Sequence, residues 1–253
     1  MNMKLFGGIL LIVGSAIGGG MLALPIATSE MGFINSSLLL LGCWAIMASS
    51  AFLILEVTLW LPKNTNIISM SRATLGGLGQ AVAWVTYLLL LYSLLAAYIA
   101  GGSDFLKNFL TMMHLNVSGA VVPILFAVLL GAIVYGGIHA VDHVNRVLMV
   151  AKLAAFILLV FLISPHVSSS HLMGGEFSSL STSTTVAITS FGFATIIPSM
   201  RNYFHDDVKK LRIAILVGSL IPLVCYIVWD FIIMGVIPRD GSDGLISMLH
   251  SGR

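Results

Sequence analysis

The fold of this chain is constrained most by long apolar runs that contain almost no charge. A bilayer core about 30 Å thick is crossed by about 20 apolar residues in a helix. Only helices and closed barrels satisfy every backbone group in lipid, and these runs are too continuously apolar for barrel strands. We therefore predict membrane helices in seven runs, which occupy residues 5–29, 31–55, 73–103, 115–138, 147–164, 177–200 and 213–238.

The composition agrees with an all-α membrane protein that crosses the bilayer several times. Of the 253 residues, 58% are hydrophobic and 9% are charged, whereas a soluble domain has about 25% charged residues. So few charges cannot cover a soluble globule. This excludes a soluble enzyme, a disordered chain and a nucleic-acid-binding module, and the net charge of +2 indicates no polyanionic partner.

The first run has an alternative interpretation as a secretory signal peptide. Lys4, the apolar stretch after it and the small residues near Ala23 fit such a peptide. Because the run is long and Gly-rich and six further runs follow, we favour a membrane helix.

The distribution of Lys and Arg predicts that the N-terminus lies in the cytoplasm. With that orientation, eight Lys and Arg residues flank the spans on the inner side, and three, Lys107, Arg239 and Arg253, lie on the outer side. Positive residues concentrate in the cytoplasmic loops of membrane proteins. The loop over residues 165–176 has no Lys or Arg and fits the outer side.

Two spans contain sequence that a straight helix would not choose. Each Gly in a helix costs about 1 kcal/mol relative to Ala, and it lets the backbone approach a ligand closely. Close helix packing is an equal alternative for either segment alone, since small residues let membrane helices touch. The first segment consists of Gly14, Ser15, Ala16, Ile17, Gly18, Gly19 and Gly20, and the second includes Ser190, Phe191, Gly192 and Phe193.

The two segments fall in the first and sixth spans, which correspond in a fold of two inverted five-helix repeats. Interrupted helices at corresponding positions indicate a transporter binding site. A half-helix beginning at Gly18 to Gly20 would offer free N–H groups to a carboxylate. Carbonyl groups near Phe191 could accept hydrogen bonds from an ammonium group. We therefore expect a site for a zwitterion such as an amino acid.

Lys152 lies near the middle of the fifth span. A charge there costs at least about 2.5–3.5 kcal/mol, which marks a functional site. Burial would favour the neutral amine and permit proton exchange. The alternative is a side chain that extends to the cytoplasmic edge, which Arg146 marks.

Several other side chains have two interpretations each. Tyr92 and Tyr98 could line a pocket or belong to the interfacial aromatic belt. Phe191 and Phe193 could stack on an aromatic substrate or face lipid. Glu56 is expected to be an interfacial carboxylate or ion-pair partner.

Asp104 and Asp230 are expected at the membrane interface. Cys43 and Cys225 each lie in an apolar run and predict no disulfide. The histidines show no metal-ligand spacing, so we expect neither a metal nor another cofactor. The chain also lacks the paired carboxylates and catalytic motifs of a membrane enzyme, and we predict that it is not an enzyme.

An ordered set of segments resembles the aromatic and hydroxy amino acid permeases over essentially the whole chain. The segments are Gly14 through Pro25, Leu55-Glu56-Val57, Ala96-Ala97-Tyr98-Ile99, Asn145-Arg146 with Lys152, Thr189 through Ser199, Lys210-Leu211-Arg212, and Gly218-Ser219 through Val224.

The resemblance implies a carrier of the bacterial inner membrane with the leucine-transporter-type inverted repeat. It implies import of tyrosine or tryptophan together with a proton, with membrane lipid as the other partner. In related carriers a lysine of the fifth helix stands in place of a sodium ion, and Lys152 falls at that position. Residues 1–164 would form the first repeat, and residues 165–253 would begin the second.

Permeases of this family have more spans than the seven predicted here. We therefore expect a chain that is truncated or split, and the tail from Asp240 is expected to be an outer loop. The alternative to a working carrier is a remnant, or a half-carrier that needs a partner chain to supply the remaining helices.

Overall fold

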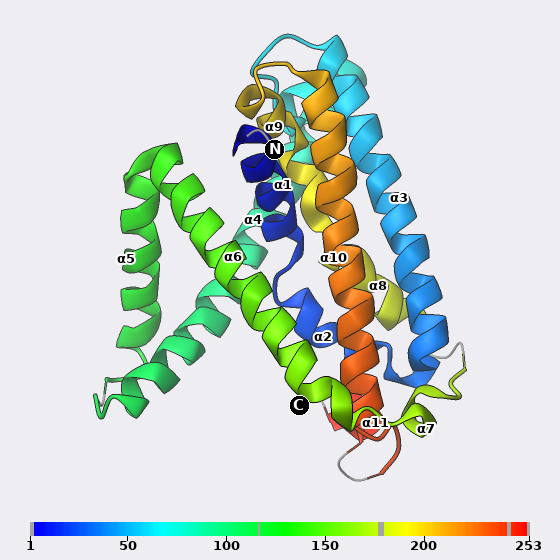
Figure 1. Cartoon of the computed structure of the whole chain (residues 1–253). Helices are drawn as coiled ribbons and strands as arrows, with labels where there is room; N and C mark the ends of the chain where they lie inside the picture. The colour runs from blue at the N-terminus through cyan, green and yellow to red at the C-terminus, as the bar shows by residue number, and fades with distance from the viewer. Residues whose placement is uncertain (1–2, 116, 177–179, 242–243, 252–253) are drawn as a thin grey trace. The chain divides into compact units, whose positions relative to one another are not determined.

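The computed structural model describes residues 3–115, 117–176, 180–241 and 244–251, in which all the regular elements are helices. The chain divides into two compact units. One unit comprises residues 1–64 and 145–253, and the other comprises Thr65–Val144. Figure 1 gives the labels of the helices. The all-α polytopic architecture predicted from the apolar runs is confirmed.

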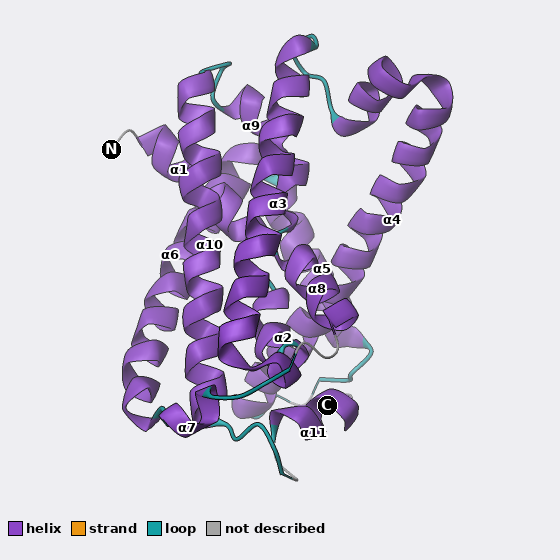
Figure 2. Cartoon of the chain, turned by 90° about the vertical axis from the view of Figure 1, so that its right-hand side faces the viewer, coloured by secondary structure: helices purple, strands orange, loops and turns teal. Residues whose placement is uncertain are grey.

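In the first unit, two long helices, α3 and α10, lie side by side along most of their length (Figure 2). Helix α1 packs against α10 and lies at the centre of this unit. The elements of the unit are α1 (Met3–Ala16), α2 (Gly20–Ala27), η1 (Ser29–Met31), α3 (Gly32–Trp60), most of α6 (Gly137–Ile163), η2 (Ser164–His166), α7 (Ser169–Leu172), α8 (Leu180–Ser190), η3 (Gly192–Ile196), α9 (Ile197–Tyr203), α10 (Val208–Val236) and α11 (Leu245–Ser251).

The second unit consists of α4 (Ile67–Met112), α5 (Val121–Tyr135) and the first residues of α6, and α4 packs against α5. Asn66 begins α4 with a capping box, in which its side chain accepts a hydrogen bond from the Ser69 amide. Gly76 interrupts the helical geometry with φ 72° and ψ −162°, a conformation that glycine adopts most readily.

Five helical segments in the described residues are long and apolar enough to cross a membrane, and the bent pair of α1 and α2 is long and apolar enough when the two helices are taken together. The five segments are Ser29–Trp60, Ile67–Met112, Ala140–His166, Leu180–Tyr203 and Val208–Val236. The remaining predicted run, residues 115–138, contains α5, which has 15 residues. This helix is shorter than the about 20 residues that a perpendicular crossing needs.

Both segments predicted to be interrupted depart from regular helix. In the first span, α1 ends at Ala16, α2 begins at Gly20, and the axis bends by 48° (Figure 1). In the sixth span, α8 ends at Ser190 and is followed by the 3₁₀ helix η3 before α9 begins. Pro198 stands in the first turn of α9, where its missing N–H leaves no hydrogen bond unmade.

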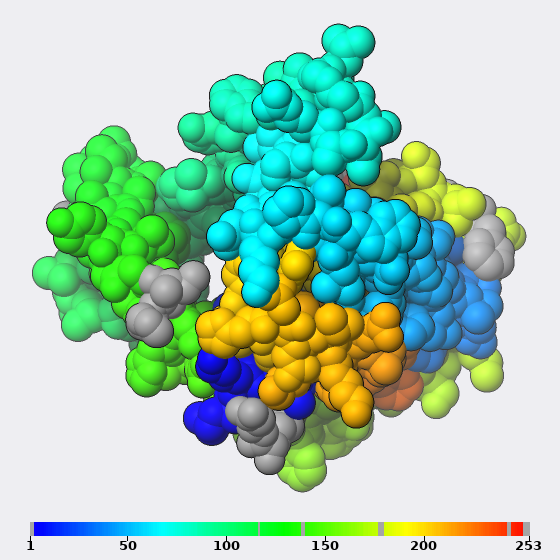
Figure 3. Space-filling view, turned by 90° about the horizontal axis from the view of Figure 1, so that it is seen from above, coloured from blue at the N-terminus to red at the C-terminus, as the bar shows by residue number. Residues whose placement is uncertain are grey.

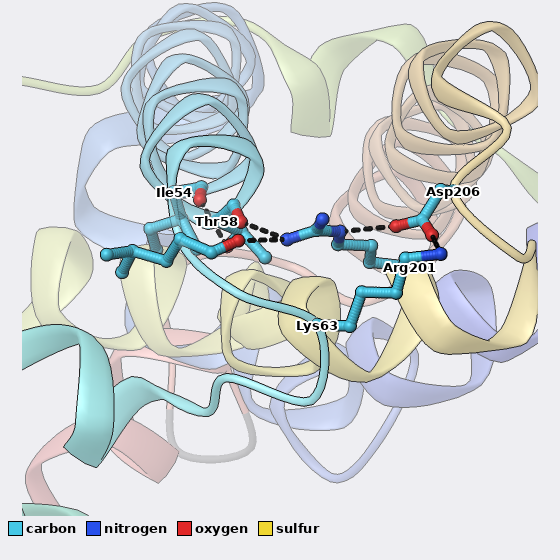
Figure 4. A network of polar contacts seen from close by, with 6 residues as sticks. Ile54, Thr58, Lys63, Arg201 and Asp206 are labelled. Atoms are coloured by element: carbon cyan, nitrogen blue, oxygen red, sulfur yellow. Dashed lines mark hydrogen bonds and ion pairs between the residues drawn. The ribbon is translucent and has the colours of Figure 1, made fainter.

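One end of the first unit is held by a buried arginine (Figure 4). Arg201 on α9 donates hydrogen bonds to the carbonyls of Thr58 and Leu61, which satisfy the otherwise unpaired end of α3. The Nε atom of Arg201 and the Nζ atom of Lys63 each lie 2.6 Å from a carboxylate oxygen of Asp206. Figure 3 views this end, where the segment around residues 200–212 lies beside the end of α3 and the start of α1.

Three expectations about chain ends and charges differ from the structure. The loops expected after residue 164 and after Asp240 contain η2, α7 and α11, and α11 packs against α2 and η1. The side chains of Glu56 and Asp104 are exposed, and their position at the membrane interface stays a prediction. The interfacial position expected for Asp230 is wrong, because its side chain is completely buried, and its carboxyl lies within hydrogen-bond distance of hydroxyl groups on neighbouring elements.

Candidate functional site

The two helix breaks meet at the side chain of Tyr226. This residue lies in the middle of α10 and is completely buried. Its hydroxyl oxygen is 2.8 Å from the carbonyl oxygen of Ala16, the last residue of α1, and 2.8 Å from that of Ser190, the last residue of α8. A hydroxyl has one proton to donate. One tyrosine therefore bridges two helix ends, and its proton is shared between two acceptors.

Two further contacts hold the broken spans together. A Cβ atom on Gly20, at the start of α2, would lie 3.1 Å from Cβ and 3.2 Å from Cα of Ser190. Only glycine allows the backbones to approach this closely. At the other end of α2, Ser183 of α8 donates a hydrogen bond of 2.7 Å to the Ala27 carbonyl. The two half-helices α2 and α8 are thus joined at both ends.

The loop before α2 presents backbone amides without partners. Among the described residues, Gly18 and Gly19 donate no backbone hydrogen bond, whereas their carbonyls accept from Met21 and Leu22. Gly19 is exposed, and a Cβ atom placed on it would meet no atom within 4 Å. The amides stand at a helix N-terminus, where the helix dipole favours negative charge.

The carbonyl ends of α1 and α8 supply the opposite polarity. Helix C-termini carry partial negative charge, which favours a cation. Lys152 on α6 already uses one of these groups, since its Nζ atom is 2.5 Å from the Ile17 carbonyl oxygen. The side chain of Lys152 therefore points to the break between α1 and α2.

The remaining residues of the Gly-rich segment are occupied by packing. A Cβ atom on Gly14 would lie 2.8 Å from Oδ1 of Asn145 and 2.9 Å from the sulfur of Met149, so this glycine allows close contact with α6. Ser15 donates to the Ile12 carbonyl within its own helix. Ala16 and Ile17 are buried, and their carbonyls are the groups that Tyr226 and Lys152 reach.

Phe191 and Phe193 lie inside the unit. Both rings are completely buried. The interpretation that they face lipid is therefore wrong. The ring of Phe191 packs edge-on against that of Tyr226, with centroids 5.1 Å apart. Gly192 between them leaves open space, since a Cβ atom there would meet no atom within 4 Å.

Tyr92 and Tyr98 belong to the second unit. They lie on α4, and their side chains are exposed. Their contribution to a substrate pocket stays a prediction.

Tyr226, which makes the contact that joins the two breaks, is not among the site residues predicted from the sequence. The available signal was a phenolic hydroxyl in the middle of an apolar span, because a buried tyrosine hydroxyl needs a partner. The sequence could not name that partner, which lies 210 residues away at Ala16.

Neither a metal cluster nor a disulfide marks the site. In the described residues no group of three His, Cys, Asp or Glu side chains could hold a metal ion. Cys43 and Cys225 are buried free thiols. A hollow of about 560 Å³ lies elsewhere on the first unit, along the Ser- and Thr-rich face of α8 from Leu180 to Thr189.

Comparison with known proteins gives relatives along nearly the whole chain. The chain is 36% identical over 94% of its length to tyrosine-specific transport system 1 of Haemophilus influenzae, and 37% identical over 94% to tyrosine-specific transport system 2 of that organism. It is 32% identical over 93% of its length to glutamine transporter 2 of Aliivibrio fischeri. The names of these relatives are those of transport proteins, which agrees with the prediction that the chain is not an enzyme.

The chain spans 59% of the length of each tyrosine-specific relative and 62% of the length of the third. No solved structure matches it. The model of the tryptophan/tyrosine permease family matches residues 1–248. With its apolar helices, this match makes the chain a multi-pass membrane protein. The chain belongs to the tryptophan/tyrosine permease family.

Proposed function

We propose that this chain is a secondary carrier that imports an aromatic amino acid, tyrosine or tryptophan, together with a proton. The observation that carries the proposal is the bridge from Tyr226 to Ala16 and Ser190, which brings two interrupted spans to one point. The names of the tyrosine-specific relatives support the choice of substrate class.

The two charges of an amino acid match the two kinds of helix end. The amides of Gly18 and Gly19 would bind the carboxylate, with the positive end of the α2 dipole behind them. The carbonyls of Ala16 and Ser190 share a single tyrosine proton, which leaves acceptor capacity for the ammonium group. Gly19 and Gly192 leave room beside the backbone for the rest of the substrate.

Lys152 is the group that we propose to exchange the coupled proton. In its charged form it donates to the Ile17 carbonyl at the same break that would hold the substrate. Loss of the proton would remove the charge of Lys152, weaken this hydrogen bond and loosen α6 from the end of α1. Substrate binding and proton binding would then both act on the break between α1 and α2.

The proposed location is the bacterial inner membrane, with the N-terminus in the cytoplasm. The cluster of Lys63, Arg201 and Lys210 lies at the N-terminal end of α1 in the first unit, and positive residues mark the cytoplasmic side. The start of α2 then faces the middle of the bilayer, and its end faces outward.

The alternative is a half-carrier that binds its substrate but needs a partner chain for transport. This possibility follows from the share of the relatives' length that the chain spans. Both proposals predict the same binding site, and they differ in transport by this chain alone.

Uptake of labelled tyrosine into vesicles containing this chain alone tests the proposal. We expect accumulation driven by an inward proton gradient and competition by unlabelled tryptophan, but little competition by glutamine.

Lys152→Met should bind tyrosine while its uptake no longer follows the gradient, and Lys107→Met, a control on α4, should behave as wild type. Uptake that follows the gradient in Lys152→Met would reject the role of the lysine. Binding without uptake would favour the half-carrier.

A further inference from the structure

Asp230 is a buried carboxyl group that the proposed mechanism does not use. It lies on α10, more than one turn beyond Tyr226, and its side chain is completely buried. Its Oδ2 atom lies 2.5 Å from the Ser36 hydroxyl on α3 and 3.4 Å from the Thr28 hydroxyl at the end of α2. In the described part of the chain, its Oδ1 atom is buried and has no hydrogen-bond partner.

The surroundings of Asp230 do not suit an ionised carboxylate. A buried charge is costly unless it is paired and fully hydrogen-bonded. Charged groups and titratable side chains do occur on the elements that pack around α10, but none of those described contacts Asp230. They are Lys4 on α1, Glu30 on η1, Cys43 and Glu56 on α3, Arg146 and Lys152 on α6, His166 on η2, His171 on α7, and Arg201 and Tyr203 on α9.

The spacing of four oxygen atoms indicates where a proton is needed. Oδ2 of Asp230 is 2.5 Å from the Ser36 hydroxyl oxygen, which is 3.1 Å from the Thr28 hydroxyl oxygen. The Thr28 oxygen is in turn 2.8 Å from the Leu24 carbonyl oxygen in α2. Taken as hydrogen bonds, these three contacts need one proton each between their two oxygens.

The two hydroxyl groups supply only two of those three protons. Ser36 and Thr28 can each donate once. A carboxylate at position 230 would leave one of the three contacts without a proton. A protonated carboxyl supplies the third, so that Asp230 donates to Ser36, Ser36 to Thr28, and Thr28 to the Leu24 carbonyl.

We propose that Asp230 binds a proton in this structure, and that the protonated carboxyl fastens the outer end of α2 to α3 and α10. A bound metal cation fits less well, because oxygen ligands around a cation lie farther apart than 2.5 Å. Release of the proton would leave a negative charge with too few donors and would loosen α2. Since α2 directly follows the amides of the proposed substrate site, a link to transport rests on the proposed function, but the proton site itself does not.

Infrared spectroscopy of the chain in lipid at pH about 7 tests the proton site directly, since exposed carboxyls are ionised there. We expect the stretching band of a protonated carboxylic acid in the wild type, and its loss in Asp230→Asn, which keeps the shape of the neutral acid. Glu56→Gln, on the exposed face of α3, is the matched control and should keep the band. An absent band in the folded wild type, a band that persists in Asp230→Asn, or a band abolished by Na⁺ would overturn the proposal.

A second variant covers the case in which Asp230→Asn does not fold. Ser36→Ala removes the acceptor of the Asp230 proton, and the band should then stay but shift to the frequency of a more weakly hydrogen-bonded acid. An unshifted band would show that Asp230 does not donate to Ser36 and would overturn the proposed chain. Failure to bind tyrosine with the band intact would instead contradict the proposed function alone.

Discussion

At the scale of single residues, Tyr226 is the side chain on which the geometry of the site depends most. Tyr226→Phe removes one hydroxyl from two buried carbonyls, those of Ala16 and Ser190. We expect the free energy of unfolding to fall by about 1–3 kcal/mol, the cost of an unsatisfied buried polar group. Denaturant titration in mixed micelles measures this, with Tyr135→Phe, an exposed tyrosine of the second unit, as the control. Equal stability of the two variants would mean that Tyr226 does not tie the breaks together.

A second residue-scale prediction concerns acid and the loop before α10. Hydrogen bonds from Lys63, and then from Arg201, lower the pKa of Asp206 below its ordinary value of 3.8. A carboxyl with a lowered pKa contributes stability that is complete above the ordinary value and is lost as the pH falls through the folded value.

Acidification from pH about 6 to about 3 should therefore lower the thermal midpoint of wild type more than that of Asp206→Asn. Asp240→Asn removes a carboxyl that is 76% exposed and weakly paired, and it should leave the wild-type acid response unchanged. The prediction fails if acidification lowers the thermal midpoint of wild type and that of Asp206→Asn by the same amount.

At the scale of elements, the break between α1 and α2 gives two neighbouring glycines different roles. Gly19 has ordinary right-handed backbone angles, φ −60° and ψ −27°, and open space around it. Neither conformation nor crowding within the described residues requires glycine there, which agrees with the proposed approach of a ligand. Gly20, in contrast, packs against Ser190.

Gly19→Leu should insert and fold like wild type but lose tyrosine binding. Gly20→Ala should lower the thermal stability, because its methyl group would push α2 away from α8. Membrane yield, thermal melting and equilibrium binding separate these effects. Unchanged tyrosine affinity in Gly19→Leu would remove that glycine from the site.

The sequence predicts the elements better than it predicts their partners. The absence of charge delimits the spans, and the runs around Gly18 and Gly192 predict both interruptions, because glycines weaken helices wherever the chain places them. The bridge from Tyr226 and the burial of Asp230 were not predictable. Ala16 lies 210 residues from Tyr226 and Thr28 lies 202 residues from Asp230, and contacts of that range depend on which helix faces meet.

At the scale of the whole molecule, the positive residues predict the side of the membrane on which each end lies. In a chain whose Cys43 and Cys225 are replaced by serine, we expect an impermeant maleimide to label Ser170→Cys in intact cells. Lys63→Cys should react only after lysis. Labelling of Lys63→Cys in intact cells would reverse the proposed orientation and place Asp230 on the inner side.

The account as a whole depends on recognition of both charges of an amino acid by the ends of broken helices. Equilibrium binding of tyrosine, tyramine and hydroxyphenylpropionate to the chain in lipid tests this most directly, because the last two each lack one of the charged groups. Charge-assisted hydrogen bonds contribute about 1.5–3 kcal/mol each, so each analogue should bind roughly tenfold to a hundredfold more weakly than tyrosine. Affinity for either analogue equal to that for tyrosine would contradict the account.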